Sequence, residues 1–170
     1  MRILGIDPGS RATGFAFIEA SGGRYSFLEA GVLPVPRRGS FAERLGEIGR
    51  ALEDLLDRHH PDECAVEDLF HAVNARSALR LAHARGVILS CLARRGYAVA
   101  EYTPLQVKKA VSGYGLAEKG ALKVLLERLL GIPGTLTEDA SDAVAVALCH
   151  AQAVPMRDAL AHARAAEERG

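Results

Sequence analysis

The sequence lacks a long hydrophobic run, and no stretch approaches the roughly 18 consecutive apolar residues that a membrane-spanning helix needs. Its first residues enter a strand-like segment directly, without the basic and apolar regions of a secretory signal peptide. Cysteine is also scarce: the three cysteines lie far apart in apolar surroundings and form no C-x-x-C pair. This pattern indicates reduced thiols in a core rather than disulfides or a zinc site, so we expect a cytoplasmic protein.

A net charge is absent as well, because 21 Lys and Arg residues balance 21 Asp and Glu residues. The charges are nevertheless segregated along the chain. Residues 41–70 carry an excess of six acidic groups, and residues 76–123 carry an excess of seven basic groups. Such segregation can give a neutral protein an electropositive face, but charge alone favours the simpler interpretation of solvated helix surfaces.

The length of 170 residues suits one domain with a full core and is too short for two ordinary domains. We expect that domain over residues 1–153. The segment after Pro155 has little to bury, so residues 154–170 are expected to form a mobile tail.

Hydrophobic patterning predicts strands first and then a mixture of strands and helices. The first three strands are expected at residues 2–6, 13–20 and 25–33, and the glycine pair between the last two suits an antiparallel hairpin. Ser40 with Glu43 three residues later is a capping-box pattern, which predicts a helix running to about residue 59.

The rest of the chain continues the same mixture. The expected elements are a strand at 63–68, a helix at 74–94, a strand at 97–103, short helices at 104–111 and 118–130, and a last helix from residue 137 or 138. This order predicts a single α/β domain, a mixed sheet with helices on its faces.

Carboxylates stand at three places where stability alone does not require them. Asp7 ends the first strand, Glu67 ends the fourth, and Asp139 and Asp142 open the last helix on the same side. Each has an ordinary role too, as a turn former before Pro-Gly, a solvated strand end, or a helix cap. Strand ends of an α/β sheet converge in space, however, so we expect these four side chains to lie close together.

Four converging carboxylates repel one another at neutral pH unless a cation compensates them. Ligands that are all oxygen suit a hard ion, which predicts Mg²⁺ or Mn²⁺ rather than zinc. Two such ions about 4 Å apart can activate a water molecule and stabilise a leaving oxygen in phosphodiester hydrolysis.

Five segments resemble, in order and spacing, the signature segments of RuvC-type Holliday-junction resolvases. They are GIDPGSRATG (5–14), AVEDLF (65–70), NARSALRLAHARG (74–86), QVKKAVSGYGLAEK (106–119) and DASDAVAVALCH (139–150). The resemblance covers residues 2–150. It implies a ribonuclease-H-like fold, crossover junction endodeoxyribonuclease activity with paired incisions in four-way DNA junctions, a homodimer, and a branch-migration motor complex as partner.

The resemblance also assigns roles to residues. The catalytic set, which in this family binds two divalent cations per active site, maps onto Asp7, Glu67, Asp139 and Asp142. Asp68 and Glu138 stand beside two of these residues, so the choice rests on alignment. The helix at 74–94 matches the element through which the subunits pair. The residues expected to bind DNA are Phe70, Arg76, Arg80, Lys108, Lys109 and Lys119. Phe70 matches an aromatic that stacks on a junction base, and Lys108 and Lys119 match positions at the DNA backbone.

Two other interpretations compete with a resolvase. The stretch DPGS…TG at residues 7–14 also looks like the first phosphate loop of actin-like ATPases and sugar kinases. That class needs a second nucleotide-binding half, for which the chain is too short. A catalytically inactive junction-binding relative would be expected to have lost acids, and all four are present. The sequence therefore favours the nuclease, and Asp7 as one corner of its metal site.

Overall fold

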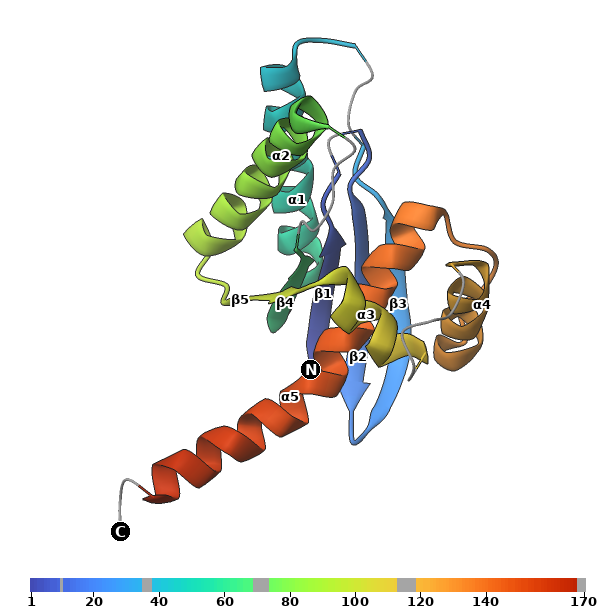
Figure 1. The fold of residues 1–170 in the computed structure, drawn as a ribbon, viewed down its shortest axis with the longest axis vertical. Helices are drawn as coiled ribbons and strands as arrows, with labels where there is room; N and C mark the ends of the chain where they lie inside the picture. Colours follow the sequence, from blue (N-terminus) through green and yellow to red (C-terminus); the bar gives the residue numbers. More distant parts are fainter. Residues whose placement is uncertain (10, 35–37, 69–73, 113–118, 168–170) are drawn as a thin grey trace.

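The computed structural model of the chain describes residues 1–9, 11–34, 38–68, 74–112 and 119–167, with the backbone alone described at 119–121 and 160–167 (Figure 1). Its elements follow the predicted order. They are β1 (Arg2–Asp7), β2 (Gly14–Ser21), β3 (Arg24–Val32), α1 (Phe41–His59), β4 (Glu63–Glu67), α2 (Ala75–Arg94), β5 (Val99–Tyr102), α3 (Pro104–Ser112), α4 (Lys119–Leu130) and α5 (Glu138–Glu167).

The five strands form one mixed sheet in the order β3-β2-β1-β4-β5. The first three strands are antiparallel neighbours, whereas β4 and β5 run parallel to β1. The hairpin between β2 and β3 turns at Gly22 and Gly23, whose φ angles of 57° and 77° lie in the left-handed region that glycine adopts most easily. This topology confirms the α/β mixed sheet expected of a ribonuclease-H-like fold.

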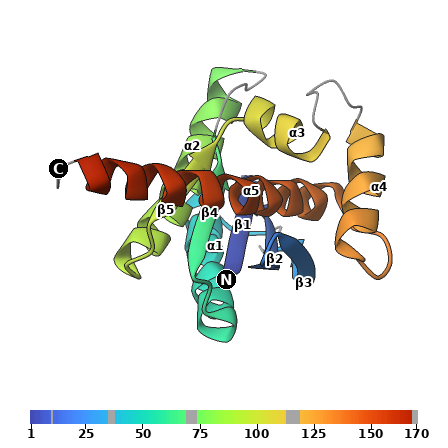
Figure 2. The same cartoon turned by 90° about the horizontal axis from the view of Figure 1, so that it is seen from below.

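Helices cover both faces of the sheet (Figures 1 and 2). Alternate residues of each strand point to opposite faces, so Leu4 and Ile6 pack in one core with α1 and α2. Ile3 packs in the second core with α5, which crosses the sheet, and with α3 and α4 beside it. The odd-numbered positions of β1, Asp7 among them, therefore face α5.

Helix α1 begins as its capping box predicts. The Ser40 hydroxyl accepts a hydrogen bond from the Glu43 main-chain N–H at 3.2 Å, and the Ser40 N–H donates to the Glu43 carboxylate at 2.6 Å. The apolar stripe of this helix faces the sheet, with Ile48, Leu52 and Leu55 buried. Sequence periodicity was sufficient here because one helix face meets one sheet face.

The acidic and basic segments of the chain meet where α1 packs on α2. Arg94 pairs with Glu53 at 2.8 Å, and both guanidinium nitrogens of Arg95 bond to Asp57, at 2.5 and 3.0 Å. Part of the charge that is segregated along the sequence is thus neutralised within the fold.

The bounds of one strand differ from the prediction, because main-chain groups at its two ends form hydrogen bonds with the neighbouring helices. The fifth strand covers 99–102 instead of 97–103, because the Tyr97 N–H donates to the Leu92 carbonyl at the end of α2 and the Thr103 N–H donates to the Gln106 side chain at the start of α3. The three cysteines are free and buried, as predicted. None of the helices in the described ranges combines the length and the apolar character needed to cross a membrane.

Helix α5 continues past Pro155 to Glu167, and its last turns project from the body of the protein (Figure 1). The Arg157 guanidinium binds both carboxylate oxygens of Glu63, at 2.7 and 2.8 Å, which ties the start of this extension to β4. The tail expected after Pro155 is therefore helical over most of its length. Its mobility stays a prediction, as does the domain boundary at residue 153.

Candidate active site

Asp7 and Glu67 stand side by side because β1 and β4 are parallel neighbours. Ile6 pairs with Val66 in the register of the two strands, so the next residue of each strand lies at the same edge of the sheet. Both side chains point to the α5 face, and the Asp7 and Glu67 carboxyls share a hydrogen bond. The register, which the sequence could not supply, is what makes them a pair.

Asp139 and Asp142 come to the same edge on the first turns of α5. The helix begins after Thr137, whose hydroxyl accepts a hydrogen bond from the Ala140 N–H at 3.3 Å. Carboxylates in this position interact favourably with the positive end of the helix dipole. The start of α5 and the ends of β1 and β4 lie close together in Figure 1.

The convergence of the four acids is seen most directly in the pKa of Asp7. Burial is the largest cause and the carboxylates of Glu67, Asp142 and Asp139 add to it, so the pKa of Asp7 rises from 3.8 to about 8. A carboxyl group with such a pKa is largely protonated at neutral pH. A cation at this place would relieve the repulsion and return Asp7 to its ionised form.

The four side chains fit a divalent cation by their chemistry but do not form a closed cage. Among the residues that the structure describes, no three Asp, Glu, His or Cys side chains close around one point as the ligands of an enclosed ion would. Mg²⁺ is commonly held by one or two carboxylates, with water and substrate phosphate oxygens in its other positions. An open, oxygen-only group of carboxylates at a sheet edge suits that mode of binding.

The acids adjacent in sequence are placed differently. Asp68 follows Glu67 but lies toward α2, where the Arg85 guanidinium approaches its carboxylate at 3.2 Å and also pairs with Glu101. Neither Asp68 nor Glu138 is among the groups that raise the pKa of Asp7. The structure thus brings together the four carboxylates that the resemblance assigned; their catalytic role stays a prediction.

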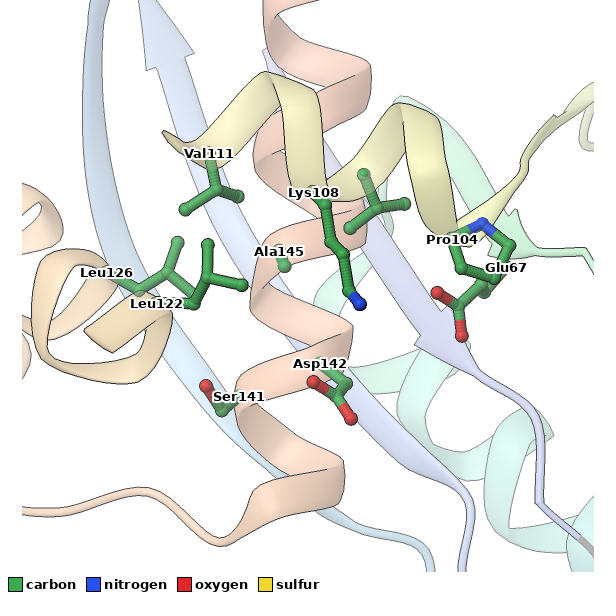
Figure 3. A pocket seen from close by; sticks show the side chains of 10 residues that line it. Glu67, Pro104, Lys108, Val111, Leu122, Leu126, Ser141, Asp142 and Ala145 are labelled. Carbon is green, nitrogen blue, oxygen red and sulfur yellow. The ribbon is translucent and has the colours of Figure 1, made fainter. Parts of the chain in front are cut away.

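A cavity of about 200 Å³ opens beside the carboxylates, between α3, α4 and α5. Most of the side chains that line the cavity are apolar, and three charged side chains, those of Glu67, Asp142 and Lys108, also line it. Figure 3 shows the Lys108 side chain reaching down from α3 with its nitrogen on the side of the two carboxylates. Ser141 also lines the cavity. No pattern in the sequence indicated this residue, because the cavity arises only from the packing of three helices.

The structure describes three of the other residues that are expected to bind DNA. Arg76 and Arg80 are exposed on the first turns of α2, and the Arg80 guanidinium lies 5.6 Å from the centre of the Phe41 ring, within cation–π range. Lys109 is exposed on α3. Phe70 and the side chain of Lys119 lie outside the described part of the chain.

Comparisons with known proteins agree on one family. Residues 3–150 match the family model described as "Crossover junction endodeoxyribonuclease RuvC". A protein of that name from Azorhizobium caulinodans is 47% identical to the chain, in an alignment that covers 89% of each protein. Another, from Geobacter sulfurreducens, is 44% identical over 94% of this chain and 98% of the relative. The structure of T. thermophilus RuvC in complex with a Holliday junction substrate superposes with a TM-score of 0.86 at 30% identity, over 92% of this chain and 96% of that one.

Proposed function

The chain belongs to the RuvC family of crossover junction endodeoxyribonucleases, and we propose that it resolves Holliday junctions with Asp7, Glu67, Asp139 and Asp142 as its catalytic carboxylates. The observation that carries this site assignment is the meeting of Asp7, Glu67 and the start of α5 at one edge of the sheet, where burial and three other carboxylates raise the pKa of Asp7. Perturbed carboxyls grouped beside a cavity are typical of active sites.

Membership of this family implies dependence on a divalent metal. The finer proposal is two ions of Mg²⁺ or Mn²⁺ per active site, held by the four carboxylates. Metal ions bound by carboxylates in this way supply an activated water molecule and stabilise the oxygen that leaves the phosphate.

The side chains of the protein position the substrate for that chemistry. The parallel register of β1 and β4 holds the Asp7 and Glu67 carboxyls side by side, and the positive end of α5 faces the same edge. Lys108, on the cavity rim, is placed to bind a phosphate oxygen of the cleaved strand. In the reaction the water oxygen bonds to phosphorus and the bond to the 3′ oxygen breaks, which leaves a 5′-phosphate and a 3′-hydroxyl.

Binding of the junction is proposed to rest on basic groups around this site. Lys108 and Lys109 on α3 and Arg76 and Arg80 on α2 are exposed and can contact phosphates, which gives affinity without sequence information. Phe70 and Lys119 are included on the resemblance alone, as a base-stacking group and a backbone contact.

The four-way junction has two strands to cut, so paired symmetric nicks require two active sites. We propose a homodimer formed through α2, on which Ala75, Ala82 and Gly86 are exposed and Leu79 is 61% exposed. Small residues on one helix face let a second helix approach closely. A branch-migration motor complex as a further partner is proposed from the family resemblance.

The function is tested with an immobile four-way junction, purified protein and either Mg²⁺ or Mn²⁺, with cuts mapped on all four strands. We expect paired symmetric nicks with 5′-phosphate ends. Asp7→Asn and Glu67→Gln should bind the junction and fail to cut it. Asp68→Asn is the matched control, because its carboxylate pairs with Arg85 instead, and it should retain cleavage.

Wild-type cleavage rates in Asp7→Asn would contradict the assignment of the site. Junction binding without cleavage by the wild type, in either metal, would favour the inactive-relative alternative. The actin-like ATPase alternative has no support from the family match, which spans residues 3–150 as a resolvase.

A further inference from the structure

Gly14 occupies a position between two of the proposed catalytic carboxylates. It is the cross-strand partner of Asp7 in the antiparallel pair of β1 and β2. On its other side, the first turn of α5 lies directly on it. A Cβ atom on Gly14 would come within 2.6 Å of the main-chain carbonyl carbon of Asp139 and closer still to the carbonyl oxygen.

A second glycine makes the same kind of contact about two turns further along the helix. A Cβ atom on Gly5, in the middle of β1, would lie 2.5 Å from the Ala147 main-chain nitrogen and 2.7 Å from the Ala147 Cβ atom. Side-chain Cβ atoms essentially never come within 3.0 Å of such neighbours. Both glycines face α5, because they stand at alternate positions on that side of the sheet.

We infer that Gly14, supported by Gly5, is a positioning residue that sets how far the Asp139 and Asp142 carboxylates stand from Asp7. This inference rests on the proposed function. At these two points backbone meets backbone, so no flexible side chain can absorb a change in spacing. A methyl group on Gly14 requires the start of α5 and β2 to move apart, and we expect the helix to move outward with both of its carboxylates.

The expected effect on catalysis is large, because a shift of about 1 Å in catalytic groups can lower a rate about 10²-fold. Gly14→Ala should therefore cleave the junction at least about 10²-fold more slowly than wild type. Binding of the junction in EDTA should change little, since the basic side chains on α2 and α3 are not displaced. Binding of Mn²⁺ without DNA, measured by titration calorimetry, should weaken at least tenfold.

Gly31→Ala is the matched control. Gly31 lies on β3, next to the same end of β2, and a Cβ atom there would meet only the edge of the Phe15 ring, at 3.1 Å. It makes the same chemical change in the same sheet without touching α5. Its cleavage rate and Mn²⁺ affinity should stay within about threefold of wild type, and circular dichroism should show that both variants are folded.

A rescue separates positioning from general damage to the fold. Asp139→Glu lengthens the side chain by one carbon–carbon bond of about 1.5 Å, which is enough to bring the carboxylate back from a displaced helix. Alone it should slow cleavage, whereas in the Gly14→Ala background it should raise the rate at least tenfold. If Gly14→Ala does not fold, Ala147→Ser supplies a milder push on α5 from the helix side and should give a smaller loss of the same kind.

A folded Gly14→Ala protein with the cleavage rate and Mn²⁺ affinity of Gly31→Ala would overturn the inference. So would a slow Gly14→Ala protein with wild-type Mn²⁺ affinity and no rescue by Asp139→Glu. If the wild type itself cuts no junction, the proposed function fails, yet the Mn²⁺ affinities of the two alanine variants still decide whether Gly14 sets the spacing of the carboxylates.

Discussion

The surroundings of Asp7 disfavour the ionised form of its carboxyl group. Its side chain is largely buried, its neighbours across the sheet and on α5 are also acids, and its pKa rises to about 8 as a result. Such a site destabilises the metal-free protein and is retained where function needs it. The sequence identified Asp7 by its place at the end of a strand, but the size of the shift depends on distances that only the fold sets.

The metal-free protein should lose stability as the pH rises, because of Asp7. Its folded-state pKa of about 8 lies above the ordinary value of 3.8, so its contribution to stability is fully present below about pH 4 and is lost as the pH rises through 8. Asp7→Asn should therefore melt at a higher temperature than wild type at pH 8 in EDTA, and the two melting temperatures should nearly coincide at pH 4. Equal melting temperatures of Asp7→Asn and wild type at pH 8 would show that the neighbouring carboxylates do not destabilise ionised Asp7.

Adding Mn²⁺ at pH 8 serves as the companion measurement. The ion should raise the melting temperature of the wild type and should raise that of Asp7→Asn much less, because a ligand that binds the folded state stabilises it more when it binds more tightly.

At the scale of elements, α5 joins two ends of the sheet. Its first turns bring Asp139 and Asp142 to the active site, and a later turn carries His150, which is only 2% exposed. His150 Nδ1 accepts a hydrogen bond from the Tyr102 hydroxyl at 2.8 Å, and its Nε2–H donates to the Glu63 carboxylate at 2.7 Å. Arg157, about two turns further along the helix, completes this group by binding Glu63.

This group should make the protein sensitive to acid. Arg157 is the largest cause that lowers the pKa of Glu63 to about 2, and burial lowers the pKa of His150. Folding stability should thus fall as the pH drops below about 6.5, where the unfolded chain protonates its histidine, and again from about 4.5 through 2 for Glu63.

Arg157→Met tests the contribution of Glu63. We expect a lower urea midpoint at pH 7 and a smaller further loss between pH 4.5 and 3, since Glu63 then titrates closer to its ordinary pKa. Arg50→Met is the matched control, because Arg50 pairs with Glu47 on the exposed surface of α1. The same midpoint for both variants at pH 7 would show that the Arg157 contact contributes nothing.

At the scale of the whole molecule, the proposed paired incision requires two active sites on one junction. The exposed small residues of α2 predict a dimer, and Ala82→Glu should place a charge in its interface. Sedimentation at micromolar concentration should give a dimeric mass for wild type and a monomeric mass for Ala82→Glu, whose nicks should no longer be paired. Leu28→Glu, at an exposed position of β3 on the opposite edge of the sheet from β5, should remain dimeric. A monomeric wild type would contradict paired incision by a preformed dimer.

The sequence by itself determined the order of the elements and the capping of α1, and it predicted the four carboxylates of the site. These features are local or lie in short ordered segments, and periodicity, caps and motifs report them without reference to distant residues. Only the tertiary structure decided that Asp68 is paired with Arg85 while Glu67 faces Asp7, that a cavity lies beside Lys108, and that α5 rests directly on Gly14. The reason is physical: each depends on strand register and on the distance between a helix and a sheet, which packing across the whole chain sets.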